Sequence, residues 1–158
     1  MAESSVQGFV PLPPAEAFDV FANQIDVWWP RQGVFPYSFA PKTTRPLHIR
    51  FEAEENGRLY ETFLDESEYV IGRITKWDPP HSLVHTWRDP TWEGDTTVTV
   101  TFTAVIGGTQ FVVEQDGFAA AGQPDLPPYY DIGNRQTMAA FAAHCTAIHE
   151  LRQLQNQG

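Results

Sequence analysis

The stretch that decides the fold, residues 71–87, reads Ile71-Gly72-Arg73-Ile74-Thr75-Lys76-Trp77-Asp78-Pro79-Pro80-His81-Ser82-Leu83-Val84-His85-Thr86-Trp87. Asp78-Pro79-Pro80 cannot continue a strand, because each proline lacks an N–H and restricts the residue before it. The β-prone residues on either side therefore predict two antiparallel strands joined by a tight turn. Trp77 and Trp87 can each bury roughly 150–250 Å², which a lone hairpin cannot do. We expect this hairpin to lie in the middle of a larger sheet, with something packed on one face.

Alternating apolar and polar residues predict further strands on both sides of this hairpin. Asn56-Gly57 and Gly107-Gly108 are turn signals between such runs. Because the last six strands follow one another through tight turns, we expect them to pair as an antiparallel meander. The expected strands are residues 6–10, 47–52, 58–63, 71–77, 82–87, 96–103 and 109–115.

Two short helices are expected after the first strand, and one long helix at the C-terminal end. Pro14 begins a short helix with acidic residues in its first turns, and Pro30 ends a second one. The long helix starts near Tyr129 and carries an apolar stripe. A curved sheet and one amphipathic helix bury each other best when the sheet wraps the helix. We expect an α+β fold of about seven antiparallel strands around that helix, in a single domain over residues 1–158. The residues of the stripe are Met138, Phe141, Cys145 and Ile148.

Composition limits the classes of partner. A chain of 158 residues suits one domain that buries roughly two-thirds of its unfolded surface. The formal net charge of −10 repels nucleic acid, and no apolar run reaches the roughly 18 residues that span a bilayer. Cys145 is the sole cysteine, so there is no disulfide framework, and residues 1–5 lack the pattern of a signal peptide. We expect a cytoplasmic protein, monomer or homodimer, that binds no nucleic acid and has no membrane span.

The space between sheet and helix is expected to be rich in aromatic rings with a few polar groups among them. Such a lining is typical of a pocket for a flat apolar ligand, and the same rings could equally form a filled core. Residues 31–46 add further rings, which either pack against the body or line the mouth of the pocket. The candidate cavity residues are Trp28, Trp29, Tyr37, Glu61, Phe63, Ile74, His85, Trp87, Val100, Phe102, Tyr129, Asn134, Met138, Phe141 and Cys145.

Glu61 and His85 are the candidates for acid–base chemistry. Glu61 shares a strand face with Phe63, so its carboxylate must be hydrogen-bonded, paired or protonated. An ion pair with Arg73 or Arg50 is the simpler interpretation, and a ligand-orienting or catalytic carboxylate is the alternative. His85 lies on the apolar face of its strand, where a lone histidine is more often structural than catalytic. We therefore assign no catalytic residue.

No metal and no cofactor is expected. His81 and His85 lie about 13 Å apart on an extended chain, too far to share an ion. His144 and His149 project from opposite edges of the helix stripe. The chain has no Gly-x-Ser-x-Gly elbow and no glycine-rich phosphate loop, and Cys145 is interpreted as a small buried hydrophobe rather than a nucleophile.

Five segments keep an order that spans most of the chain: Trp28-Trp29-Pro30, Gly57-Arg58-Leu59-Tyr60-Glu61, Gly72-x-Ile74-x-x-Trp77-Asp78-Pro79-Pro80, Leu83-x-x-Thr86-Trp87 and the strand Thr96–Phe102. Together they resemble the activator-of-heat-shock-protein-90-ATPase-like branch of the START/SRPBCC superfamily. The chain departs from that pattern in two places. One glycine precedes Arg58 instead of two, and Gly133-Asn134 stands where a tryptophan is usual at the head of the final helix.

The resemblance implies a helix-grip fold, in which a curved antiparallel sheet grips a C-terminal helix around an internal cavity. Three functions are considered. The first, which rests on the aromatic interior with its few polar groups, is the binding of a small hydrophobic or aromatic molecule in that cavity. The second, which rests on the resemblance alone, is that of a co-chaperone-like module that stimulates the ATPase of heat shock protein 90. The third is a cyclase- or hydrolase-like enzyme that uses Glu61 and His85 through water.

Overall fold

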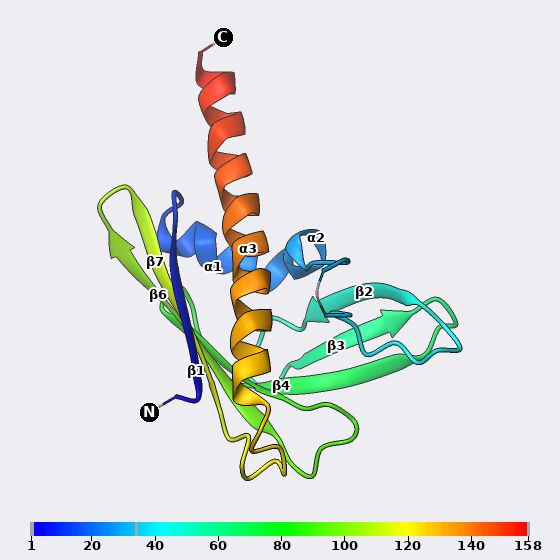
Figure 1. Cartoon of the computed structure of the whole chain (residues 1–158). Helices are drawn as coiled ribbons and strands as arrows, with labels where there is room; N and C mark the ends of the chain where they lie inside the picture. The colour runs from blue at the N-terminus through cyan, green and yellow to red at the C-terminus, as the bar shows by residue number, and fades with distance from the viewer. Residues whose placement is uncertain (1, 34, 158) are drawn as a thin grey trace.

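The computed structural model describes residues 2–33 and 35–157, which form one seven-stranded antiparallel sheet and three helices (Figure 1). The strands lie in the order β1-β7-β6-β5-β4-β3-β2. From β2 to β7, neighbours in the sheet are neighbours in the sequence, so the predicted meander is confirmed. The strands are β1 (Ser4–Val10), β2 (Pro46–Phe51), β3 (Arg58–Phe63), β4 (Glu68–Asp78), β5 (Ser82–Trp87), β6 (Thr96–Val105) and β7 (Gly108–Asp116).

The β4–β5 hairpin lies in the middle of the sheet, as the tryptophan-rich stretch predicts. Trp77 stands opposite Leu83 across the turn, and Leu83 stands opposite Val100 of β6. Leu83 and Val100 have no exposed surface, and the threonines between the buried residues of β6 are partly or fully exposed. The alternation of β6 is therefore the one expected from its sequence.

The sheet is strongly curved because β4 bends between its two neighbours. Its pairing register shifts once against β5 and once against β3. Such bulges bend a strand and increase its twist. Gly72 lies at the bend, where a Cβ atom would come within 1.8 Å of the Thr86 carbonyl oxygen. Only glycine fits this close approach of two strands, which gives the sheet its concave face.

Three helices complete the fold: α1 (Pro14–Asn23), α2 (Ile25–Trp28) and α3 (Pro127–Asn156). In Figure 1, α3 crosses in front of the sheet, with α1 and α2 on either side of it. Phe21 of α1 contacts both the sheet and α3, because the centre of its ring lies 5.8 Å from that of Phe102 of β6 and 5.4 Å from that of Phe141 of α3. The expected α+β helix-grip fold is confirmed.

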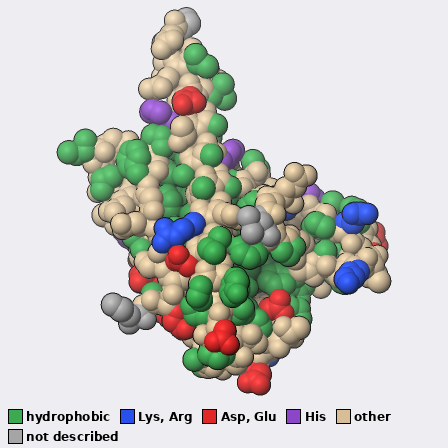
Figure 2. Space-filling model, viewed as in Figure 1, with side chains coloured by type: hydrophobic (Ala, Val, Ile, Leu, Met, Phe, Trp, Pro, Cys, Tyr) green, Lys and Arg blue, Asp and Glu red, His purple; other side chains and the backbone are tan. Residues whose placement is uncertain are grey.

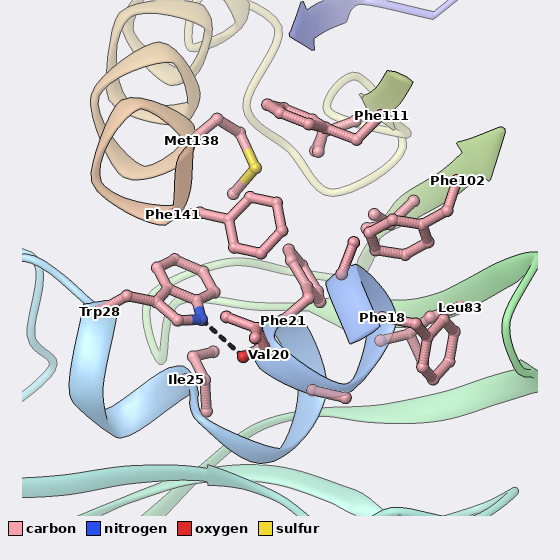
Figure 3. Close-up of a cluster of buried hydrophobic side chains, with 14 of the residues drawn as sticks. Phe18, Val20, Phe21, Ile25, Trp28, Leu83, Phe102, Phe111, Met138 and Phe141 are labelled. Carbon is pink, nitrogen blue, oxygen red and sulfur yellow. Dashed lines mark hydrogen bonds between the residues drawn. The ribbon is translucent and has the colours of Figure 1, made fainter. Parts of the chain in front are cut away.

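The core is dense where α1, α2 and α3 meet the sheet (Figure 3). The ring of Phe141 lies 5.4 Å from Trp28 and 5.3 Å from Phe111 of β7, in edge-on arrangements that aromatic pairs prefer. Trp28 Nε1 donates to the Val20 carbonyl at 3.0 Å, so its one polar atom is satisfied inside the core. This part of the concave face is filled by protein.

The apolar stripe of α3 ends before the helix does. Cys145 is fully buried and Ile148 is partly buried, whereas Leu151 and Leu154 are 57% and 66% exposed. The last turns extend beyond the sheet (Figure 1). No helix among residues 2–33 and 35–157 is long and apolar enough to cross a membrane.

Candidate functional site

A cavity of about 480 Å³ lies between the first turns of α3, the α1–α2 pair and the concave face of the sheet. Figure 2 shows hydrophobic side chains gathered around a hollow beside the lower end of α3. Pockets for drug-sized ligands have volumes of roughly 300–1,000 Å³ and mostly apolar walls. The cavity has the size and the lining for a small organic molecule.

Most of the predicted cavity residues lie in its wall. They come from α2, the segment before β2, strands β3 and β5, and the first turns of α3. Tyr129 is 58% exposed, so it lies at the rim. The predicted residues found in the wall are Trp28, Trp29, Tyr37, Glu61, His85, Trp87, Tyr129, Asn134 and Met138.

The structure places the other predicted side chains in the packed interior instead of the cavity wall. For Phe102 and Phe141 the reason is helix α1, whose Phe18 and Phe21 occupy the space beside them. Helix α1 fills the part of the concave face beside these two rings, and the cavity lies outside that part. The predicted residues outside the wall, each at most 4% exposed, are Phe63, Ile74, Val100, Phe102, Phe141 and Cys145.

Glu61 binds the irregular segment before β2, which lines the cavity, to strand β3. Its carboxylate accepts hydrogen bonds from the Phe39 backbone N–H at 2.8 Å and from the Ser38 hydroxyl. The residue is 2% exposed, and this burial raises the pKa of its carboxyl, while the two hydrogen bonds oppose the rise. Glu61 therefore connects the middle of β3 to a segment that is otherwise irregular.

The ion pair expected between Glu61 and Arg73 or Arg50 does not form. Arg50 stands opposite Tyr60 of β3, on the outer face of the sheet, and Arg73 donates to the Asn56 carbonyl at 3.2 Å. Glu61 points to the inner face, because successive residues of a strand point to opposite sides. Arg50 pairs with Tyr60 and Arg73 with Arg58, and both partners lie an odd number of residues from Glu61 on β3, so the two arginines are on the other face.

His85 presents a neutral ring to the cavity. It is 4% exposed, and its Nδ1 lies 2.8 Å from the Thr86 carbonyl oxygen, to which it donates. Burial lowers the pKa of the ring to about 4, so it is uncharged at neutral pH. With Nδ1 carrying the proton, Nε2 is left as a hydrogen-bond acceptor. No partner of Nε2 is found among the described residues.

A chain of amide and hydroxyl groups fixes the head of α3 to the sheet. Asn134 Nδ2 donates to Gln115 Oε1 at 3.0 Å, and Gln115 Nε2 donates to the Thr96 hydroxyl at 2.9 Å. Thr96 in turn donates to the Trp87 carbonyl at 2.8 Å. Gln115 is 1% exposed, so this chain satisfies polar groups that burial would otherwise penalise. It closes one side of the cavity.

Aromatic rings form another part of the wall. Trp87 lies 5.5 Å from Phe39 and 6.1 Å from Trp29, and Trp29 Nε1 donates to the Tyr37 carbonyl at 2.8 Å. The Tyr37 hydroxyl is buried and has no hydrogen-bond partner within the described chain. Tyr130 accepts from Trp87 Nε1 at 3.2 Å, and burial raises the pKa of its hydroxyl to about 12. Two protonated phenols therefore stand at the wall.

Sequence reasoning missed a substantial part of the wall. Gln115 could have been found, because it lies two residues after the inward Val113 of β7 and so shares its strand face. Ser38 and Phe39 had only a general signal, the unusual aromatic content of the segment before β2. The wall residues not predicted are Phe21, Ile25, Phe35, Pro36, Ser38, Phe39, Ile49, Phe51, Ile71, Asp89, Val98, Val113, Gln115, Leu126, Tyr130, Gly133 and Thr137.

The two candidate acid–base groups, Glu61 and His85, do not form a pair. Glu61 is engaged with Ser38 and Phe39 and His85 with Thr86, and the two side chains do not hydrogen-bond to each other. Across residues 2–33 and 35–157, no three His, Cys, Asp or Glu side chains are grouped so that they could hold a metal ion.

Solved structures share this architecture. A protein from Rhodobacter sphaeroides has a TM-score of 0.63 at 17% identity, over 95% of this chain and 94% of its own. A protein from Chromobacterium violaceum has a TM-score of 0.62 at 20% identity, over 90% and 95%. CalU16 from Micromonospora echinospora has a TM-score of 0.61 at 14% identity, over 96% and 80%. At these identities the likeness shows the fold alone.

Comparison of the amino-acid sequence with known families shows to which family the chain belongs. A search of curated protein sequences finds no match. A family model does match, over residues 11–145, which include every strand except β1, all of α1 and α2, and about the first two-thirds of α3. The matched part contains all the described residues of the cavity wall. The chain belongs to the family described as activator of Hsp90 ATPase homolog 1-like proteins, and it has a helix-grip fold.

Proposed function

We propose that this protein binds a small, flat, largely apolar molecule inside the cavity. The observation that carries the proposal is a hollow of about 480 Å³ with an aromatic wall, in an interior that is elsewhere filled. Polar atoms at the wall support it too: the Tyr37 hydroxyl is buried without a protein partner, and His85 Nε2 is an acceptor because Nδ1 carries the proton. A bound molecule would shield the rings from water and give these atoms something to bond.

The proposal predicts that N-phenyl-1-naphthylamine, an uncharged dye that fluoresces in apolar surroundings, will bind one site per chain. We expect a dissociation constant on the order of 10 µM, about 7 kcal/mol of binding free energy. The dye should also quench tryptophan emission, because Trp28, Trp29 and Trp87 lie in the wall. Titration of the dye with both signals monitored is the measurement, and no saturable binding would contradict the proposal.

Gly133 allows a sharp control for the location of the site. It lies in α3 at the cavity wall, and a Cβ atom there would meet only the Phe35 ring, at 3.8 Å. Replacing a helical glycine stabilises the helix by roughly 1 kcal/mol. Gly133→Leu should therefore keep the melting temperature and weaken the dye at least about tenfold, because its side chain occupies the cavity. Gly133→Ala, which adds one methyl group, is the matched control and should bind nearly as the parent does.

The family supports a second candidate, contact with heat shock protein 90. Its description names homologues of an activator of the chaperone's ATPase. Under this candidate, adding an excess of the protein to the purified chaperone should raise the rate of ATP hydrolysis severalfold. An unchanged rate, together with no complex on gel filtration, would remove it. Gly133→Leu should act as the parent does in this assay, because its change is internal.

A further inference from the structure

The charges at the cavity wall are all of one sign. Glu61 and Asp89 are its acidic residues, and none of the described wall residues is Lys or Arg. The positive charge of Arg31 reaches Glu61 and lowers the pKa of its carboxyl slightly, but the Arg31 guanidinium is already paired with Asp26 at 2.7 Å. A ligand anion inside the cavity would therefore meet two carboxylates and no free cation.

Two side chains of the wall offer an acceptor atom that has no donor within the described residues. His85 donates through Nδ1, which leaves the Nε2 lone pair for a ligand. Asn134 uses its Nδ2 hydrogens on Gln115 at 3.0 Å and on Ser4 at 3.4 Å, which leaves its Oδ1 as an acceptor. Both side chains belong to the cavity wall. A ligand that supplies an N–H or O–H can donate to either of these acceptors.

From these two features we infer that the cavity selects aromatic molecules that carry no negative charge and donate an N–H or O–H hydrogen bond to His85 Nε2. This inference rests on the proposed function and narrows it to a ligand class. Neutral phenols and aryl amines fit the class, whereas fatty acids and aryl carboxylates do not. Moving a carboxylate or sulfonate from water into such a site costs its hydration without a counter-charge to replace it.

Dyes that differ in one group test the charge requirement at pH 8. N-phenyl-1-naphthylamine is the neutral probe, 8-anilinonaphthalene-1-sulfonate its anionic counterpart, and the corresponding uncharged sulfonamide controls for the added bulk. We expect the sulfonate to bind at least about tenfold more weakly than the sulfonamide. Equal affinities would overturn the charge requirement and leave the proposed function intact, whereas failure of the neutral dye would contradict the proposed function itself.

Charge-neutral variants assign the effect to the wall. Glu61→Gln and Asp89→Asn should each reduce the difference in affinity between the sulfonate and the sulfonamide dye. The double variant should reduce this difference further. Glu55→Gln removes the same unit of charge from an exposed turn outside the wall and should leave the difference unchanged. A difference that persists in the double variant would overturn the role given to these carboxylates.

The donor requirement has its own pair of probes. N-methyl-N-phenyl-1-naphthylamine lacks the N–H of the parent dye and should bind about five- to tenfold more weakly. In His85→Phe, which removes the acceptor and keeps a ring of similar shape, the two dyes should bind alike. Equal binding of both dyes to the parent protein, or a preference that survives in His85→Phe, would overturn the role of Nε2.

Discussion

Replacing Phe141 with alanine is expected to lower the free energy of unfolding by about 3–5 kcal/mol, a large part of a typical domain's total. Phe141 is fully buried at the point where helix α3 meets the rest of the fold. Its ring lies 5.4 Å from both Phe21 and Trp28 and 5.3 Å from Phe111, so its loss opens a void between α1, α2 and β7 (Figure 3). Those three rings sit on separate elements and cannot all move in to fill it.

Urea unfolding followed by far-UV circular dichroism measures this loss. Leu154→Ala is the matched control, because it truncates a large apolar residue of the same helix that is 66% exposed. We expect this control to change the stability by less than about 0.5 kcal/mol. A loss below about 1 kcal/mol for Phe141→Ala would mean that α3 is held on the sheet by something other than these rings.

The sequence predicts the sheet well because strand alternation is a local property. The strands expected at residues 47–52, 58–63, 96–103 and 109–115 follow from runs with a period of two, and Asn56-Gly57 marks the turn between the first two. The hairpin over residues 71–87 follows from its β-prone residues and the prolines between them, although β4 begins at Glu68 rather than Ile71. The stripe of α3 is also local, since residues three or four apart share a face of any helix. Such patterns depend on neighbours in the chain and on little else.

The extent of the cavity could not be predicted in the same way. Alternation says that Phe102 and Glu61 face inward, but it does not say which of them meets α1 and which meets empty space. That depends on where Phe18 and Phe21 come to lie, which is set by packing between distant segments. The partners of Glu61 depend on an irregular segment, where Tyr37 adopts a positive φ of 42°. Such an irregular backbone conformation cannot be predicted from a repeating pattern of apolar residues.

The stability of the protein should fall by up to about 3 kcal/mol between pH 6.5 and pH 4 because of His85 alone. Burial lowers the pKa of this ring from 6.5 to about 4 in the folded protein. Between these two values the unfolded chain takes up a proton at residue 85 and the folded protein does not. The stability that the neutral ring contributes is therefore fully present above pH 6.5 and is lost as the pH falls toward 4.

Glu61 works in the opposite direction, and this sets the design of the measurement. Burial raises the pKa of Glu61, so the folded protein binds its proton at a higher pH than the unfolded chain does, and acid favours folding at this site.

Urea unfolding of the parent and of His85→Gln at a series of pH values isolates the histidine, because the contribution of Glu61 is common to both and cancels in the difference. Between pH 6.5 and pH 4, the free energy of unfolding of the variant should fall by up to about 3 kcal/mol less than that of the parent. His81→Gln, which removes an exposed histidine from the same hairpin, should follow the parent. Parallel curves for the parent and His85→Gln would show that the ring takes up a proton as readily in the folded protein as in the unfolded chain, and would contradict the lowered pKa of His85.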